Sequence, residues 1–320
     1  MKKILPSVPI TAVDARGRGR GSALAGDGTQ RPVIVTGAYP GDVVDVRVRR
    51  RKAGAFLGEV DGEVAGTGPP RRRPFCRHFF ECGGCTIQDI AYDDQLAFKR
   101  EMVRAAFHEV DPAPVLPAPE ERWYRNKLEF SFGAQRWLSE EEIAEAETIT
   151  DRRGFGFHAP GRFDRVIDLT ECYLQPEPSE SIRAFLREYT RAADLSYYDA
   201  REHTGLLRVA TVRTSLAGET MVIVMFGEDD PPAIRRVMEA LDEAFPDLTS
   251  LSYVVNTTRN DALAGHTVVP FSGREWITEQ CGPNRLRIRP TAFYQTNPAQ
   301  AVRLYERAVE LAALTGDETV

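Results

Sequence analysis

Apolar residues in the first part of the chain recur in short runs that alternate with polar positions, without helical spacing. These runs cover residues 8–13, 32–35, 43–48 and 58–60, and glycine-containing turns separate them. Short strands in such close succession, over about sixty residues, are typical of the five-stranded OB-like barrel. The pattern therefore predicts a small β-barrel over residues 1–63.

Beyond the barrel the pattern predicts a β-rich α+β domain over residues 64–288. Helical periodicity marks residues 93–108, with Asp93 or Asp94 as the expected cap, and residues 298–313, which Asn297 caps. Two more helices are expected at 177–192 and 231–244, and strands at 128–132, 155–158, 207–212, 221–225 and 251–256.

Length and composition place the chain among globular proteins with several domains. The 320 residues are 42% hydrophobic and 28% charged, which is ordinary for such proteins. No run reaches the ~18 apolar residues of a membrane span. Five cysteines, an odd number, favour a reducing compartment over a disulfide framework. We therefore expect a multidomain α/β protein of the cytoplasm, with no membrane partner and no evident obligate protein partner.

Charge is distributed unevenly along the chain. Residues 1–73 carry 14 Lys and Arg against 7 Asp and Glu, whereas the rest carries 27 against 40. A basic module on an acidic body predicts a nucleic-acid partner, and a solvated basic face is the alternative. The cations expected to follow a phosphate backbone are Arg16, Arg18, Arg20, Arg49, Arg50, Arg51 and Lys52.

Three of the five cysteines, Cys76, Cys82 and Cys85, fall within ten residues. A chain of this length needs no disulfide staple, so metal binding is favoured. Three clustered thiolates and one distant thiolate suit a 4Fe–4S cluster, with Cys172 or Cys281 as the fourth ligand. The alternatives are zinc held by the three cysteines with His78 or His108, and reduced thiols without metal.

The glycine-rich stretch at residues 13–21 imitates the turn of a nucleotide or S-adenosylmethionine site. Such a turn functions only between a buried strand and a helix. Residues 23–30 contain Gly26, Asp27 and Gly28, which predict a turn. We therefore expect no cofactor at this stretch.

Five segments in the right order carry a resemblance to a known family. They are residues 7–60, the cysteine cluster with Cys172, residues 124–131, residues 156–172 and residues 290–297. The chain resembles the bacterial iron–sulfur RNA uracil-5-methyltransferases, which make 5-methyluridine in ribosomal or transfer RNA. The barrel is similar to their TRAM module. The resemblance favours the 23S ribosomal RNA branch.

The resemblance implies roles for individual residues. Cys76, Cys82, Cys85 and Cys172 would hold the 4Fe–4S cluster, which would have a structural role. Phe293 would stack near the target base, and Gln295 would bind S-adenosylmethionine. Arg125 and Lys127 would contact RNA. In the family a cysteine adds to C6 of uridine, C5 takes the methyl group, and a carboxylate removes the C5 proton.

The family extends beyond this sequence into a Rossmann-like domain with the nucleophile, the base and the donor loop. Residues 289–320 would be only the first edge of that domain, on which helix 93–108 would pack, so no catalytic residue is expected here. Cys281 is interpreted as a buried or turn thiol. The expected function is RNA recognition for the methyltransferase, without methyl transfer by this chain alone. The alternative is a stand-alone, non-catalytic iron–sulfur or zinc RNA-binding protein.

Overall fold

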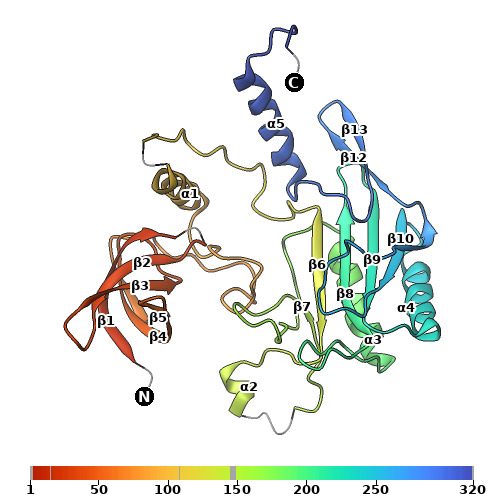
Figure 1. Ribbon diagram of the computed structural model, residues 1–320, viewed down its shortest axis with the longest axis horizontal. Helices are drawn as coiled ribbons and strands as arrows, with labels where there is room; N and C mark the ends of the chain where they lie inside the picture. Colours follow the sequence, from red (N-terminus) through yellow and green to blue (C-terminus); the bar gives the residue numbers. More distant parts are fainter. Residues whose placement is uncertain (1–2, 15, 108, 145–148, 319–320) are drawn as a thin grey trace. The chain divides into compact units, whose positions relative to one another are not determined.

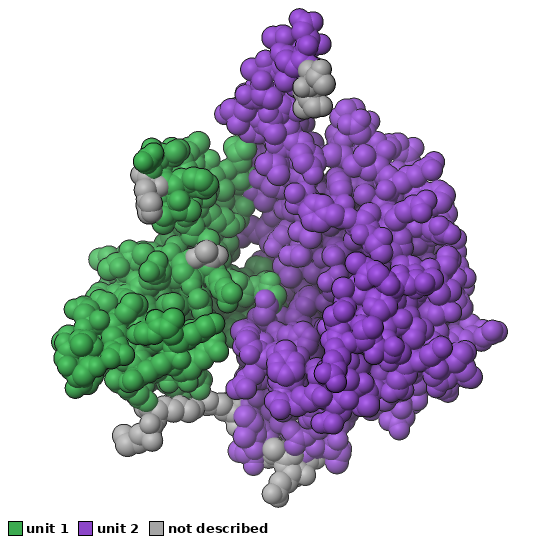
Figure 2. Space-filling model, in the orientation of Figure 1, with its two compact units in different colours: residues 1–80, 84–117 green, residues 81–83, 118–320 purple. Residues whose placement is uncertain are grey.

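The computed structural model describes residues 3–14, 16–107, 109–144 and 149–318, so the alternative zinc ligand His108 lies outside them. The chain divides into two compact units (Figure 2). Unit 1 comprises residues 1–80 and 84–117, and unit 2 comprises residues 81–83 and 118–320. Each unit is described by itself.

Unit 1 begins with a closed five-stranded barrel (Figure 1). Its strands are β1 (Ile4–Val13), β2 (Gly19–Leu24), β3 (Gln30–Thr36), β4 (Asp42–Lys52) and β5 (Ala55–Gly66). They are ordered β1-β2-β3-β5-β4, with β3 and β5 parallel and the other pairs antiparallel. Inward side chains at alternating positions, mostly valine, fill the barrel. The predicted OB-like barrel is confirmed.

The second strand of the barrel was not among the predicted runs, because its alternation of glycine and arginine suggests a loop. An added Cβ at Gly19 would lie 2.5 Å from the Ala38 carbonyl oxygen, and one at Gly21 would lie 2.3 Å from that of Pro9. These glycines therefore permit close strand packing. Residues 26–28 form the turn that was predicted there, and β3 follows it.

The rest of unit 1 is tied to the barrel by a buried polar group. The Tyr39 hydroxyl donates a 2.5 Å hydrogen bond to Asp89, and the Arg71 guanidinium lies 4.3 Å from the Tyr39 ring centre and 2.6 Å from Asp42. Helix α1 (Tyr92–Ala106) follows. Its N-cap is Ala91, without a side-chain cap, so the prediction of Asp93 or Asp94 as cap was wrong.

Unit 2 is built on a six-stranded mixed sheet (Figure 1). The strands are ordered β11-β10-β9-β8-β6-β7, and only β9 and β10 pair in parallel. Every residue of β8 and β9 is buried, which places these two strands at the centre of the core. The strand bounds are β6 (Lys127–Gly133), β7 (Gly154–Gly156), β8 (Leu207–Thr214), β9 (Thr220–Phe226), β10 (Ser250–Val255) and β11 (Val269–Gly273).

Two long helices cover this sheet side by side. Helix α3 (Ser179–Ala192) and helix α4 (Pro231–Ala244) bury their apolar faces, and the Tyr189 hydroxyl of α3 donates to the Arg236 carbonyl of α4 at 3.1 Å. Asp230 caps α4 by accepting a hydrogen bond from the Ala233 amide. A short helix, α2 (Glu140–Ala144), lies between β6 and β7 in the chain.

The chain ends in a hairpin and a helix. Strands β12 (Ile277–Cys281) and β13 (Asn284–Ile288) form an antiparallel pair whose Ile277 and Ile288 pack with Met221 of the sheet. Helix α5 (Pro298–Ala312) begins at its predicted cap, Asn297, and extends beyond the hairpin in Figure 1. Among the helices that the structure describes, none combines the length and apolar character needed to cross a membrane.

Candidate functional site

Asn126, at the start of β6, joins two of the segments that carry the family resemblance. Its side-chain Nδ2 donates to the Gln295 carbonyl at 3.0 Å, and its backbone amide donates to the Thr296 carbonyl at 2.8 Å. Its own carbonyl accepts from the Thr214 amide at 3.0 Å, at the end of β8. Segments 124–131 and 290–297, far apart in sequence, are therefore one structural feature.

A second buried group holds the same segment. Arg213 of β8 is only 7% exposed, and its guanidinium donates to the Ala292 carbonyl at 2.8 Å. Burial lowers the pKa of Arg213, and Glu129 partly opposes that effect. Asn126 and Arg213 thus donate hydrogen bonds to three backbone carbonyls between Ala292 and Thr296. These bonds fix the backbone path of residues 290–297.

A buried carboxylate completes this arrangement. Glu279 of β12 accepts from the Leu216 and Gln280 amides, each at 2.9 Å. Burial raises the pKa of Glu279 despite these donors. The Tyr294 hydroxyl is buried next to Cys281, and burial followed by this thiol raises the pKa of Tyr294 well above its usual range. The segment 290–297 is therefore supported by buried polar side chains.

The fixed loop presents Phe293 to solvent. Phe293 is 82% exposed, although its neighbours Ala292 and Tyr294 pack against the core. A large exposed aromatic on a rigid loop suits the stacking of an unpaired base. Gln295 is half-buried, and its side-chain amide has no hydrogen-bond partner within the described residues. That amide is available to a bound molecule.

Arg125 and Lys127 flank Asn126 and are both half-buried. Arg125 Nε donates to the Lys127 carbonyl at 3.4 Å, and its amide donates to the Leu174 carbonyl at 2.8 Å. Lys127 Nζ pairs with Glu129 at 2.8 Å. Glu129 therefore partly offsets the positive charge beside the loop.

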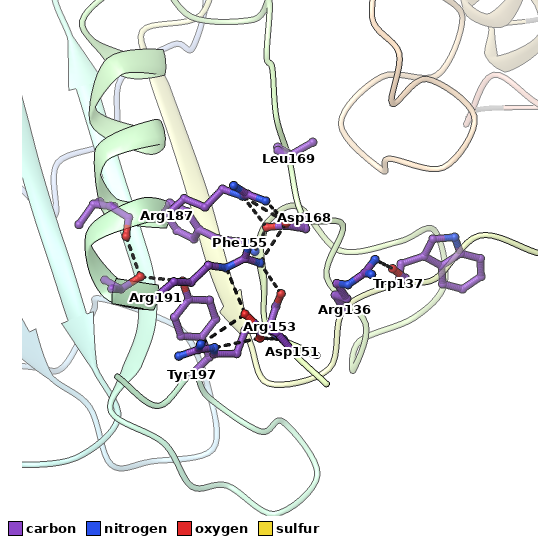
Figure 3. A network of polar contacts seen from close by, with 12 residues as sticks. Arg136, Trp137, Asp151, Arg153, Phe155, Asp168, Leu169, Arg187, Arg191 and Tyr197 are labelled. Carbon is purple, nitrogen blue, oxygen red and sulfur yellow. Dashed lines mark hydrogen bonds and ion pairs between the residues drawn. The ribbon is translucent and has the colours of Figure 1, made fainter. Parts of the chain in front are cut away.

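The backbone around Cys172 is anchored to the same region. The Trp123 amide donates to the Tyr173 carbonyl, and the Leu169 amide donates to the Phe155 carbonyl at 3.0 Å. Arg187 and Arg191 of α3 hold Asp168 at 2.5 and 3.0 Å (Figure 3). Cys172 thus lies in a segment that is fixed on both sides.

The turn that contains Cys82 contacts the hairpin formed by residues 157–167 of unit 2. The Gly83 amide donates to the His158 carbonyl, and an added Cβ at Gly83 would lie 2.7 Å from that oxygen. Residues 157 and 167 pair through the Ile167 amide, so this hairpin also leads to Cys172. Within unit 2, the Cys82 turn and the Cys172 segment therefore have one common support.

Cys76 and Cys85 belong to unit 1, and the Cys76 amide donates to the buried Gln88 side chain at 3.0 Å. All the cysteines are partly buried. Across the described residues, no three His, Cys, Asp or Glu side chains are grouped as a metal site. Cysteine thiolates are soft donors, the donor type that an iron–sulfur cluster takes.

The predicted phosphate contacts of the barrel fall into two classes. Arg18 is paired with Asp14 at 2.6 Å, and Arg49 is paired with Glu59. Arg51 lies over the Phe56 ring, 4.8 Å from its centre. Those that are exposed without an acidic partner among the described residues are Arg16, Arg20, Arg50, Arg51 and Lys52.

Sequence reasoning missed Asn126, Arg213 and Glu279 as supports of the loop. Asn126 stood inside a recognised segment, so its position was a usable signal. Arg213 and Glu279 had none, because an arginine in a strand and a glutamate in a polar run are ordinary surface residues until the fold buries them.

No protein-family model matches the chain. Two curated relatives, each named an uncharacterized RNA methyltransferase, come from Porphyromonas gingivalis and Bacteroides thetaiotaomicron. The first is 41% identical over 299 residues, covering 90% of this chain and 64% of the relative. The second is 35% identical over 297 residues, covering 90% of this chain and 65% of the relative. The chain thus spans just under two thirds of the length of these RNA methyltransferases.

A solved structure shares the fold. It is the Pyrococcus abyssi tRNA (uracil-54, C5)-methyltransferase in complex with S-adenosyl-L-homocysteine, with a TM-score of 0.67 and 23% sequence identity. The likeness covers 95% of this chain and 65% of that chain. At this identity it shows the arrangement of elements alone.

Proposed function

We propose that this chain is the RNA-recognition portion of an S-adenosylmethionine-dependent RNA (uracil-5-)-methyltransferase that makes 5-methyluridine in 23S ribosomal RNA. One observation carries the proposal: Asn126 and Arg213 grip the backbone on both sides of Phe293, which is 82% exposed. The names of the curated relatives support the reaction class.

Each part of the chain has a role in this proposal. Phe293 stacks on the target base or on its neighbour, and Gln295 contacts the methyl donor, which supplies the methyl group. Arg125, Lys127 and the exposed barrel cations hold the RNA backbone, which positions the RNA without reading its sequence. Methyl transfer also needs a nucleophile, a base and a donor loop, and this proposal assigns none of them to residues of this chain.

The first experiment measures binding of unmodified 23S ribosomal RNA fragments and transfer RNA, with Phe293→Ala as the test variant. We expect tighter binding to ribosomal RNA, and a loss of about 1–3 kcal/mol on truncation of a stacking aromatic. Phe163→Ala, which removes another exposed phenylalanine, is the matched control and should bind as the wild type does.

Three results would contradict parts of this proposal. Equal binding by Phe293→Ala would reject the stacking role. Tighter binding to transfer RNA would reject the ribosomal target. Incorporation of labelled methyl groups by this chain alone would reject its role as a recognition portion.

We also propose that Cys76, Cys82, Cys85 and Cys172 hold a 4Fe–4S cluster, with a structural role. Anaerobic purification should give a brown protein that contains iron and sulfide. Cys172→Ser should lose most of the iron, whereas Cys281→Ser should keep it. A colourless protein that contains zinc would instead favour the stand-alone zinc RNA-binding alternative.

A further inference from the structure

Strand β13 and the residue that follows it carry three arginines at alternate positions. Arg285, Arg287 and Arg289 follow one another at intervals of two residues, or ~6.7 Å along a strand. Leu286 and Ile288 alternate with them, and Ile288 packs in the core. Cross-strand pairing of Ile277 with Ile288 fixes this register, so the arginines share the other face. We call these residues the arginine stripe.

The arginine stripe is not neutralised within the protein. All three residues are exposed, and none has an ion pair within the part of the chain that the structure describes. By contrast, the nearby Arg274 is paired with Glu219 at 2.6 Å. Arg287 is also held in place, because its guanidinium lies 5.0 Å from the centre of the Trp276 ring. Three cations without an acidic partner among the described residues therefore face solvent, and the Trp276 ring holds one of them.

The stripe leads directly to Phe293. The Ala292 amide donates to the Arg289 carbonyl at 3.0 Å, so a tight turn joins the end of the stripe to the exposed aromatic. Arg213 fixes that same turn through the Ala292 carbonyl. A row of cations ending at a stacking platform is the combination that binds single-stranded nucleic acid.

We infer that the arginine stripe binds successive backbone phosphates of the RNA strand whose unpaired base stacks on Phe293. The inference rests on the proposed function and adds a phosphate-binding surface to it. The spacing of the arginines along β13 suits an extended strand, in which successive phosphates are a similar distance apart. Since arginine is charged at all ordinary pH values and makes bidentate phosphate contacts, this surface contributes affinity irrespective of sequence.

The test is the salt dependence of RNA binding. Fluorescence anisotropy with a labelled single-stranded oligouridylate gives the dissociation constant of the full chain from ~50 to ~300 mM KCl. The triple variant Arg285→Gln, Arg287→Gln, Arg289→Gln should bind roughly tenfold or more weakly at low salt. The slope of log K against log salt should fall by about 2, because each lost single-strand phosphate contact removes about 0.7.

Matched variants separate a local contact from a change in net charge. Arg235→Gln, Arg236→Gln, Arg259→Gln removes three other exposed arginines of unit 2 and should leave the slope near its wild-type value. Arg287→Lys keeps the charge and should keep most of the slope. If the triple variant does not fold, the double variant Arg285→Gln, Arg289→Gln takes its place, because it spares the contact of Arg287 with Trp276. The double variant should reduce the slope of log K against log salt by more than one.

The outcomes distinguish this inference from the function on which it rests. If the wild-type chain binds RNA and the triple variant has the same salt slope as the control variant, phosphate binding by the arginine stripe is contradicted. The proposed RNA recognition would still stand. If the wild-type chain shows no salt-dependent RNA binding, the proposed function itself is contradicted.

Discussion

At the scale of single residues, Asn126 shows how a small polar side chain organises the candidate site. Its amide Nδ2 donates to the Gln295 carbonyl, and its backbone amide donates to the Thr296 carbonyl. Because the Gln295 carbonyl belongs to a segment distant in sequence, removal of the side-chain amide leaves a partly buried acceptor short of a donor. Such an unsatisfied group is costly to bury.

Asn126→Ala is therefore expected to destabilise unit 2 by roughly 1–2 kcal/mol, from loss of the side-chain hydrogen bond to the Gln295 carbonyl. Urea denaturation measures this free energy of unfolding, and hydrogen exchange should accelerate in residues 290–297. Asn284→Ala, at the exposed first residue of β13, is the control and should leave both the free energy of unfolding and the exchange rate nearly unchanged. Unchanged exchange in Asn126→Ala would contradict the loop-holding role.

Gly83→Ala tests the support of the Cys82 turn. The added Cβ would lie 2.7 Å from the His158 carbonyl oxygen, so the turn has to move. We expect a loss of about 1–3 kcal/mol, as for other overpacked positions, and a lower iron content of the purified chain. Gly26→Ala is the control, because no atom lies within 4 Å of its added Cβ. Wild-type iron content in Gly83→Ala would show that the turn tolerates the shift.

At the scale of elements, helix α3 acts as a support through arginines one turn apart. Arg183 donates to the Leu169 carbonyl, and Arg187 and Arg191 both reach Asp168 (Figure 3). Residues at i and i+4 lie on one face of a helix, so a single face holds the segment that leads to Cys172. The helix therefore positions a loop as well as filling the core.

The β12–β13 hairpin is fastened to β9 by Glu219, which accepts from the Thr278 amide at 2.6 Å and pairs with Arg274. Burial alone would raise the pKa of Glu219, but these donors lower it below its ordinary 4.5. Since the unfolded chain binds this proton more tightly, the carboxylate stabilises the fold above pH 4.5, and this stabilisation is lost as the pH falls below it.

Glu219→Gln should accordingly lower the free energy of unfolding at pH 7 by roughly 1–2 kcal/mol, because a charged acceptor is lost. Its stability should also fall less steeply than that of the wild type as the pH drops below 4.5. Denaturation at a series of pH values measures both. Glu275→Gln, exposed in the neighbouring loop, should follow the wild-type profile.

The elements that sequence predicted well carry local signals. Helix α4 was predicted with its observed bounds, and α5 to within a residue, because Asp230 or Asn297 caps each one before a proline. Strand β12 was missed because its central residues Thr, Glu and Gln give no apolar alternation, and β13 because Leu286 and Ile288 are only two alternating apolar positions among arginines. They exist because Ile277 and Ile288 find a core contributed by another strand.

The residues of the candidate site also divide into those that the sequence indicated and those that it did not. Phe293 and Gln295 were found through the family resemblance, and no local pattern of polarity identified them. Their supports could not be found, because the contacts of Asn126 with Gln295 and of Arg213 with Ala292 span 169 and 79 residues. Contacts at such separations depend on topology, which a single sequence leaves open.

At the scale of the whole molecule, the net charge does not indicate which surfaces can bind RNA. The chain carries −6 overall, yet the barrel and the arginine stripe each present exposed cations without acidic partners among the described residues. Several predicted barrel contacts, such as Arg18 and Arg49, are partly neutralised by Asp14 and Glu59. The unpaired cations should therefore dominate phosphate binding.

A barrel variant, Arg20→Gln, Arg50→Gln, Lys52→Gln, should reduce the salt slope of RNA binding by about 2 on a long oligouridylate. Combined with the triple variant of the arginine stripe, the reduction should reach about 4, because independent contacts to one RNA strand add. Arg18→Gln, Arg49→Gln is the control, with a smaller change per charge, since internal acids already compete for these arginines. A combined slope no lower than that of either variant alone would show that the two surfaces do not engage the same RNA. In that case the barrel and the loop that bears Phe293 would have to bind separate strands, and recognition would rest on the loop and its stripe.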